Sequence, residues 1–180
     1  MIDDWRAKWY TSSYGNTDPM FPFGFVQALL SADGTSNVTV GGFPTIRWAQ
    51  TANYGYVPNP HMQNIFMAVS MDLRDPTSPY DSIHPRDKLD VGARLALAAR
   101  GVAYKETDVY FTGAIATGAT LIGLQLVTVV VDFTSVGPSG LDLLYPYGFE
   151  VQCSGSTSLL EGTAVKVDGG HFRLLDEIIR

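Results

Sequence analysis

The chain has 180 residues, enough for one domain with a sizeable core or for one domain and part of a second. Apolar residues make up 46% of it and charged residues 17%, a composition typical of globular proteins. The net charge is −6, which argues against a nucleic-acid partner because phosphate binding needs a basic surface.

The first apolar pattern predicts a short amphipathic helix over residues 1–9, with Trp5 and Trp9 one turn apart on one face. We expect the two indoles to pack in a core or an interface. The segment lacks the basic and apolar regions of a signal peptide, and we expect it to be an interior point of a longer protein.

Residues 23–30 form an apolar run that predicts a central parallel strand, and residues 65–71 predict another strand. Between them, Pro44 opens a predicted helix over residues 45–52. His61 lies in a Pro- and Asn-rich loop before the second strand, with no metal-binding or nucleophilic residue near it in sequence. We therefore interpret His61 as a surface histidine.

A polar loop follows residue 71, and a helix is predicted from Pro85 to Tyr104. Acidic residues in its first turns and Lys105 at its end suit the helix dipole. His84 is thus predicted to lie where a strand has ended and a helix begins. In α/β folds this edge is where ligands and catalytic groups collect.

Asp81 precedes His84 by three residues, a spacing that allows a carboxylate to hold an imidazole. A neutral imidazole held in this way can accept a proton from a serine hydroxyl. Asp72 and Asp75, which follow the strand directly, are rival partners for the ring. The alternative is structural, with His84 beside a helix N-cap and Asp81 a solvated loop acid.

After Lys105 the pattern changes to strand-like runs separated by Gly, Pro and Ser, at residues 109–111, 121–133, 148–153 and 163–167. We place a boundary near residue 106. The longest apolar stretch, residues 121–131, is too short for a membrane helix and predicts a buried strand. His171 lies in a predicted turn with a structural role.

Two further residues bear on the cellular compartment. Cys153 is the single cysteine, so no internal disulfide forms, and the thiol is either free or paired outside the chain. Asn37 begins the glycosylation sequon Asn37-Val38-Thr39 in a Ser- and Gly-rich loop, which leans weakly towards a secretory route.

Several segments together resemble a known family. They are residues 2–6, 21–27, 43–51, 54–60, 66–73, 82–88, 91–100 and Tyr104. In this order they resemble the carboxyl-terminal catalytic block of the sialate O-acetylesterases, which have an SGNH-type, flavodoxin-like hydrolase domain. The resemblance covers roughly residues 1–112 well and the remainder more loosely.

The resemblance implies an α/β fold in which residues 1–105 are the carboxyl-terminal part of an SGNH-type parallel sheet with helices. Residues 106–180 would then be a small, mainly β accessory domain, which we expect to be truncated because the last residues, 174–180, are apolar and unfinished. Lysosomal or secreted localisation is implied as well.

The implied activity is a serine esterase that removes O-acetyl groups from sialic acids, with His84 and Asp81 as catalytic residues. The family takes its serine from a Gly-Asp-Ser-like or Gly-Gln-Ser-like turn, and this sequence contains neither. The nearest approach, residues 14–17, lacks the serine. We therefore expect a missing amino-terminal part to supply it, and the isolated chain to be inactive. No cofactor and no metal is expected.

Two alternatives remain open for the ligand. The substrate could be another acetylated saccharide such as acetylated xylan, or the chain could be a non-catalytic carbohydrate-binding fragment. Because the net charge gives no overall attraction for an anionic sugar, a preference for sialic acid would need local bases. Arg74 and Arg86 are the nearest in sequence to His84, and both are more simply explained as solvated loop charges.

Overall fold

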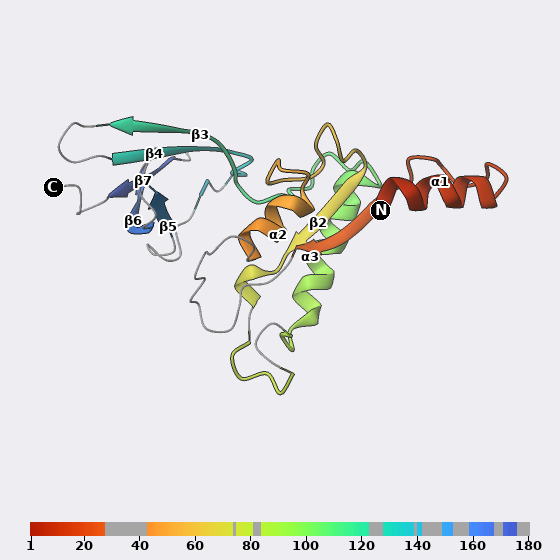
Figure 1. The fold of residues 1–180 in the computed structure, drawn as a ribbon, viewed down its shortest axis with the longest axis horizontal. Helices are drawn as coiled ribbons and strands as arrows, with labels where there is room; N and C mark the ends of the chain where they lie inside the picture. The colour runs from red at the N-terminus through yellow and green to blue at the C-terminus, as the bar shows by residue number, and fades with distance from the viewer. Residues whose placement is uncertain are drawn as a thin grey trace. The chain divides into compact units, whose positions relative to one another are not determined.

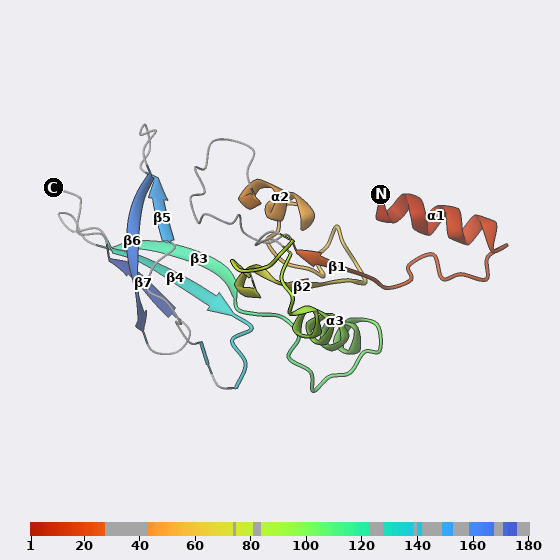
Figure 2. The ribbon, with the colours of Figure 1, turned by 90° about the horizontal axis from the view of Figure 1, so that it is seen from below.

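A computed structural model describes residues 1–27, 43–73, 75–80, 84–122, 128–138, 140–141, 149–152, 159–167 and 171–175. The chain forms two compact units, Met1–Phe111 and Thr112–Arg180 (Figures 1 and 2). The first unit extends beyond the boundary predicted near residue 106. A reason is visible at Gly101, where an added Cβ would lie 2.2 Å from the ring of Phe111, so the segment after the helix packs back onto it.

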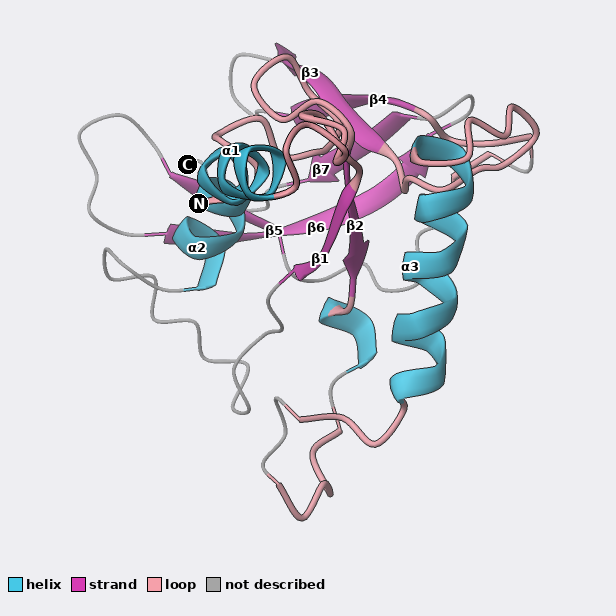
Figure 3. Ribbon diagram, turned by 90° about the vertical axis from the view of Figure 1, so that its right-hand side faces the viewer, coloured by secondary structure: helices cyan, strands magenta, loops and turns pink. Residues whose placement is uncertain are grey.

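The first unit combines helices with a parallel pair of strands. Its elements are α1 (Ile2–Ser12), β1 (Phe23–Gln27), α2 (Phe43–Gln50), β2 (Ile65–Val69), the 3-10 turn η1 (Met71–Leu73) and α3 (Lys88–Val102). The strands β1 and β2 run parallel, with Phe23 opposite Ile65. Helix α3 packs against both strands, and Figure 3 shows it beside β2. The strands and helices predicted within residues 1–104 are therefore confirmed, with shifted ends.

The core of the first unit lies between α3 and the two strands. Its most buried apolar residues are Val57, Ile65, Ala68, Ala98 and Val102. Ser70 is also buried, and its hydroxyl donates to the carbonyl oxygen of Gln27 at 3.1 Å. This hydrogen bond ties the end of β2 to the end of β1, just before the loop that carries His84.

Aromatic rings of α1 contact Phe21 and Phe23, although Trp5 and Trp9 stay 37% and 49% exposed, so the two indoles are only partly packed in a core. The rings of Trp5 and Trp9 stack with centroids 6.2 Å apart, and Trp5 lies 5.6 Å from the ring of Phe23. Arg6, only 3% exposed, donates to the carbonyl oxygens of Phe21 at 2.8 Å and Gln63 at 3.0 Å. One side chain thus holds α1 against the residues that precede both strands.

The predicted start of the long helix at Pro85 is wrong. Helix α3 begins at Lys88, because the Asp87 side chain caps it by accepting a hydrogen bond from the Asp90 amide at 3.1 Å. An aspartate in this position satisfies a backbone donor that has no partner within the helix. His84 therefore lies in the loop before α3 and not directly at its start.

The second unit is antiparallel. Its strands are β3 (Ile115–Ile122), β4 (Thr128–Thr134), β5 (Phe149–Gln152), β6 (Leu159–Val167) and β7 (His171–Leu175), in the order β3-β4-β7-β6-β5. An α/β part followed by a mainly β part is confirmed. An SGNH-type fold is compatible with these elements and stays a prediction.

Three expectations for the second half of the chain are wrong. The apolar residues 121–131 do not form one buried strand, because Leu121 lies in β3 at 71% exposure and the following strand, β4, starts at Thr128 and runs antiparallel to it. Residues 109–111 form no strand. His171 opens β7, opposite Asp132 of β4, and does not lie in a turn.

None of the helices in the described ranges combines the length and the apolar character needed to cross a membrane. Asn37, Cys153 and Arg74 lie outside the described residues. The glycosylation site and the fate of the thiol stay predictions. His61 is exposed in the loop before β2, as expected, and its ring lies 5.5 Å from that of Tyr54.

Candidate active site

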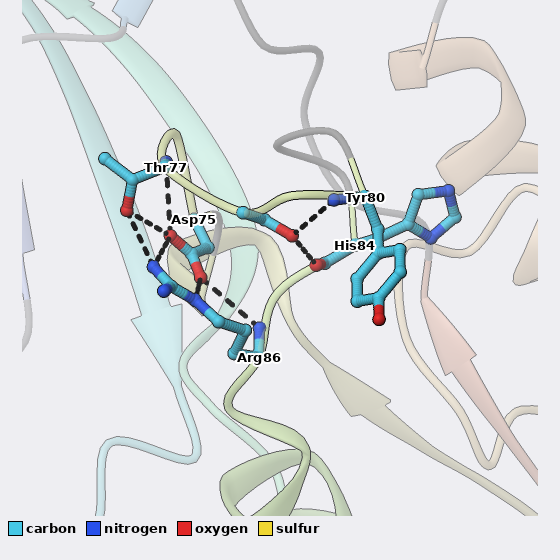
Figure 4. Close-up of polar contacts among 6 residues, drawn as sticks. Asp75, Thr77, Tyr80, His84 and Arg86 are labelled. Atoms are coloured by element: carbon cyan, nitrogen blue, oxygen red, sulfur yellow. Dashed lines mark hydrogen bonds and ion pairs between the residues drawn. The ribbon is translucent and has the colours of Figure 1, made fainter.

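His84 is exposed in the loop between η1 and α3, on the side where β2 ends. The next residue, Pro85, is buried and anchors the chain there. Figure 4 shows the imidazole directed away from Asp75 and Arg86. Within the described ranges, no hydrogen bond or ion pair engages the imidazole.

Asp81, the predicted partner of His84, lies outside the described residues, so its role stays a prediction. The two rival acids are described, and both are bound by arginines. Asp72 accepts two hydrogen bonds of 2.7 Å from Arg94 of α3, which also donates to the carbonyl oxygen of Val69. These hydrogen bonds lower the pKa of the Asp72 carboxyl group.

Asp75 is held by Arg86 in a two-point ion pair. One guanidinium nitrogen, Nη2, donates to Oδ1 at 2.9 Å, and Nε donates to Oδ2 at 2.5 Å. The Thr77 hydroxyl donates to Oδ1 at 3.0 Å and accepts from Arg86 Nη2 at 2.7 Å. The guanidinium holds the pKa of Asp75 well below its ordinary value, so the carboxylate stays ionised in weak acid.

The two rival carboxylates therefore have arginines as their partners and not the His84 imidazole. Asp72 and Asp75 join the loop to α3 and close the loop on itself, whereas the acid of a catalytic triad hydrogen-bonds the histidine. Arg86 is solvated as expected, with its side chain 59% exposed, and its charge is also offset by Asp75.

A second link fixes the backbone of His84. The Ser78 hydroxyl donates to the His84 carbonyl oxygen at 2.7 Å and accepts from the Tyr80 amide at 3.2 Å (Figure 4). The Ser78 amide itself donates to the carbonyl oxygen of Asp75 at 3.0 Å, which closes a turn. Sequence reasoning missed Ser78, Thr77 and Arg94, because only the folded loop brings these residues to their partners.

The surroundings of the imidazole are open and partly basic. A surface depression beside it is lined by Tyr80, His84, Pro85, Arg86 and Lys88. The described ranges contain no group of three or more His, Cys, Asp or Glu side chains placed to hold a metal ion. An accessible imidazole on an anchored loop is suited to accept and return a proton.

The parallel strands and their helices make the first unit an α/β structure. His84 is exposed beyond the carboxyl end of one of these strands, which is the edge where catalytic groups collect in such folds. Comparison with known proteins points to the family. The chain is 54% identical over 113 residues, 63% of its length, to the sialate O-acetylesterase of Homo sapiens. The identity to the enzymes so named from Mus musculus and Rattus norvegicus is 55% and 53% over the same length.

The resemblance to the sialate O-acetylesterases is thereby confirmed, and the chain is similar to them over this part of its length. The matched part is 20 to 21% of each relative, so the chain spans about a fifth of the curated relatives it matches. No protein-family model matches the chain.

Proposed function

We propose that this chain supplies the proton-transferring histidine of a serine esterase that removes O-acetyl groups from sialic acids. The observation that carries the proposal is His84, whose imidazole is exposed on an anchored loop beyond the carboxyl end of β2. The names of the relatives support ester hydrolysis on an acetylated sialic acid.

In the proposed reaction, a serine from outside this chain attacks the acetyl carbonyl while His84 accepts the hydroxyl proton. The imidazolium then protonates the departing sugar oxygen, which leaves an acetyl group on the serine. Water, deprotonated by His84, releases acetate and restores the serine. Each half-reaction moves one proton to the imidazole and returns it, so the ring must stay accessible on one side.

We propose Asp81 as the carboxylate that orients His84 and stabilises the imidazolium. The described rivals support this choice indirectly, because Asp72 and Asp75 already bind Arg94 and Arg86. Replacing Asp81 by Asn would then lower kcat strongly, since the imidazole loses the acceptor that fixes its tautomer.

The test grafts the matching segment of this chain into the sialate O-acetylesterase of Homo sapiens and assays hydrolysis of an O-acetylated sialic acid. The chimera carries His84 or His84→Gln. Removing a triad residue costs several orders of magnitude in kcat, so His84→Gln is expected to lose about a thousandfold or more. The 180-residue chain alone, assayed beside it, is expected to be inactive because the proposal places the nucleophilic serine outside it.

His61→Gln is the matched control, because His61 is also exposed but lies in the loop before β2. It is expected to leave kcat unchanged. Full activity of the His84→Gln chimera would refute the proposal. Hydrolysis of acetylated xylan in preference to the sialic acid would move the substrate to another acetylated saccharide. Sugar binding by the 180-residue chain, with no hydrolysis by the chimera, would favour a carbohydrate-binding fragment.

We also propose a lysosomal or secreted protein that is glycosylated at Asn37. The support is the sequon Asn37-Val38-Thr39. When the chain is directed into the secretory pathway of cultured cells, a glycan removed by peptide N-glycosidase and absent from Asn37→Gln is expected.

A further inference from the structure

The loop that carries His84 is closed at its base by side chains outside any triad. We propose that Asp75, Arg86 and Ser78 are positioning residues that hold the backbone of His84 where its imidazole can reach the reacting hydroxyl. The inference rests on the proposed function and adds to it a set of residues that act through His84 and do not touch the substrate.

The first part of the argument is the ion pair at the base of the loop. Asp75 lies just after η1 and Arg86 just before the cap of α3, 11 residues apart, and their two-point pair joins the ends of the loop. The Arg86 amide adds a weaker hydrogen bond to Oδ2 of Asp75 at 3.4 Å. A two-point guanidinium–carboxylate pair fixes orientation as well as distance, which a single contact does not.

The second part is the hydrogen bond from Ser78 to the His84 carbonyl, at 2.7 Å. Ser78 itself is fixed to Asp75, because its amide donates to the Asp75 carbonyl oxygen. The turn around Asp75 therefore holds the returning part of the loop at two residues, His84 and Arg86. Figure 4 shows these contacts on one side of the chain and the imidazole on the other.

The third part is what these contacts leave unconstrained. They engage the backbone of His84 and no atom of its imidazole. They therefore fix the position of the His84 backbone and leave both ring nitrogens available for hydrogen bonds. A general base must come within hydrogen-bonding distance of the hydroxyl, and an error of about 1 Å can cost on the order of a hundredfold in rate. An exposed loop residue needs such an anchor more than a residue in a helix does.

A purely stabilising role would look different. Arg86 is 59% exposed, and exposed ion pairs contribute little to the free energy of unfolding. Breaking the anchor should therefore change kcat much more than the melting temperature. The pKa of Asp75 is held low by Arg86, so the anchor stays ionised across the range in which a histidine titrates.

The experiment uses the chimera described above with Ser78→Ala, Ser78→Thr and Asp75→Asn. Ser78→Ala and Asp75→Asn are expected to lower kcat about 10- to 100-fold, with KM and melting temperature unchanged. Ser78→Thr keeps the hydroxyl and is expected to restore most of the rate. Because Ser78→Ala changes no charge and no contact to the imidazole, the midpoint of the acid limb of kcat/KM is expected to stay in place.

Arg100→Gln is the matched control. Arg100 forms an exposed ion pair with Glu106, 2.6 Å from Nη2 to Oε2, near the far end of α3 from His84. Its loss is expected to leave kcat unchanged. A second measurement needs no activity: in the 180-residue chain, Ser78→Ala is expected to lower the NMR order parameter of the His84 backbone amide, and Arg100→Gln is not.

Wild-type kcat in both Ser78→Ala and Asp75→Asn, while His84→Gln is inactive, would refute the positioning role and leave the proposed function standing. A loss of kcat that only follows a loss of folded protein, with an unchanged order parameter at His84, would also refute it. An active His84→Gln chimera would instead refute the proposed function.

Discussion

At the scale of single residues, two buried or partly buried arginines connect parts of the first unit that are distant in sequence. Arg6 reaches from α1 to the carbonyl oxygens of Phe21 and Gln63, and Arg94 reaches from α3 to Asp72 and Val69. A guanidinium offers five donors in a fixed plane, which allows one side chain to satisfy several acceptors. These two residues stabilise the frame on which His84 is carried.

The Arg6→Met substitution tests this at the most buried site. It removes the donors to two backbone carbonyl oxygens and leaves them without that partner, so we expect a loss of about 2 to 4 kcal/mol in the free energy of unfolding. Urea denaturation of the 180-residue chain measures it. Lys8→Met on the same helix breaks only an exposed pair with Asp4 and should cost well under 1 kcal/mol. Equal effects of the two substitutions would contradict the role given to Arg6.

The residues around His84 show which features of the site the sequence predicts and which it does not. His84 and its exposed position follow from the loop pattern, whereas the pairs Asp72–Arg94 and Asp75–Arg86 join residues 22 and 11 positions apart. No local periodicity encodes such pairs, because they depend on how the loop folds back on α3. The two acids could therefore be predicted as candidates, but not as partners of arginines.

At the scale of elements, the helix ends illustrate the limit of pattern reading. The apolar spacing predicts a helix before Tyr104, but Pro85 and Asp87 both suit its beginning. The Asp87 side chain decides the start at Lys88 by capping it. In the second unit, the apolar run over residues 121–131 contains the end of β3 and the start of β4. Hydropathy alone does not show where one strand ends and the next begins.

Two glycines of α3 give opposite expectations for the same substitution. A Cβ at Gly101 would lie 2.2 Å from the ring of Phe111, whereas one at Gly92 would meet nothing within 4 Å. Gly101→Ala should therefore destabilise the first unit by about 1 to 3 kcal/mol as the ring is displaced. Gly92→Ala should stabilise it by about 0.5 to 1 kcal/mol, because alanine favours the helix. Thermal unfolding followed by circular dichroism measures both.

If Gly101→Ala proved as stable as Gly92→Ala, the packing of residues 106–111 on α3 would be in doubt. That packing is the structural reason for a unit boundary after Phe111.

At the scale of the whole molecule, three paired acids set the direction of the expected response to pH. The pKa values of Asp72, Asp75 and Glu106 are lowered by hydrogen bonds from Arg94, Arg86 and Arg100. The stability that such groups contribute is fully present above their unfolded-state pKa, near 4, and is lost as the pH falls through the folded-state values. Because the pairs are largely exposed, we expect the urea midpoint to change little between pH 7 and pH 5 from these groups and to fall only slightly below about pH 4.

Urea titrations at a series of pH values check this expectation. Asp72→Asn, which cannot ionise, should show a smaller fall on acidification than the wild type. An increase in stability below pH 4 would contradict the assignment of these three pairs. All three lie in the first unit.

All three tryptophans of the chain, Trp5, Trp9 and Trp48, belong to the first unit. The stacked indoles of α1 rest on Phe21 and Phe23, next to the strand that pairs with β2. Indole fluorescence therefore senses the unit that carries His84, while the antiparallel sheet is silent in that signal. A denaturation curve recorded by fluorescence and one recorded by calorimetry should separate whenever the two units melt independently.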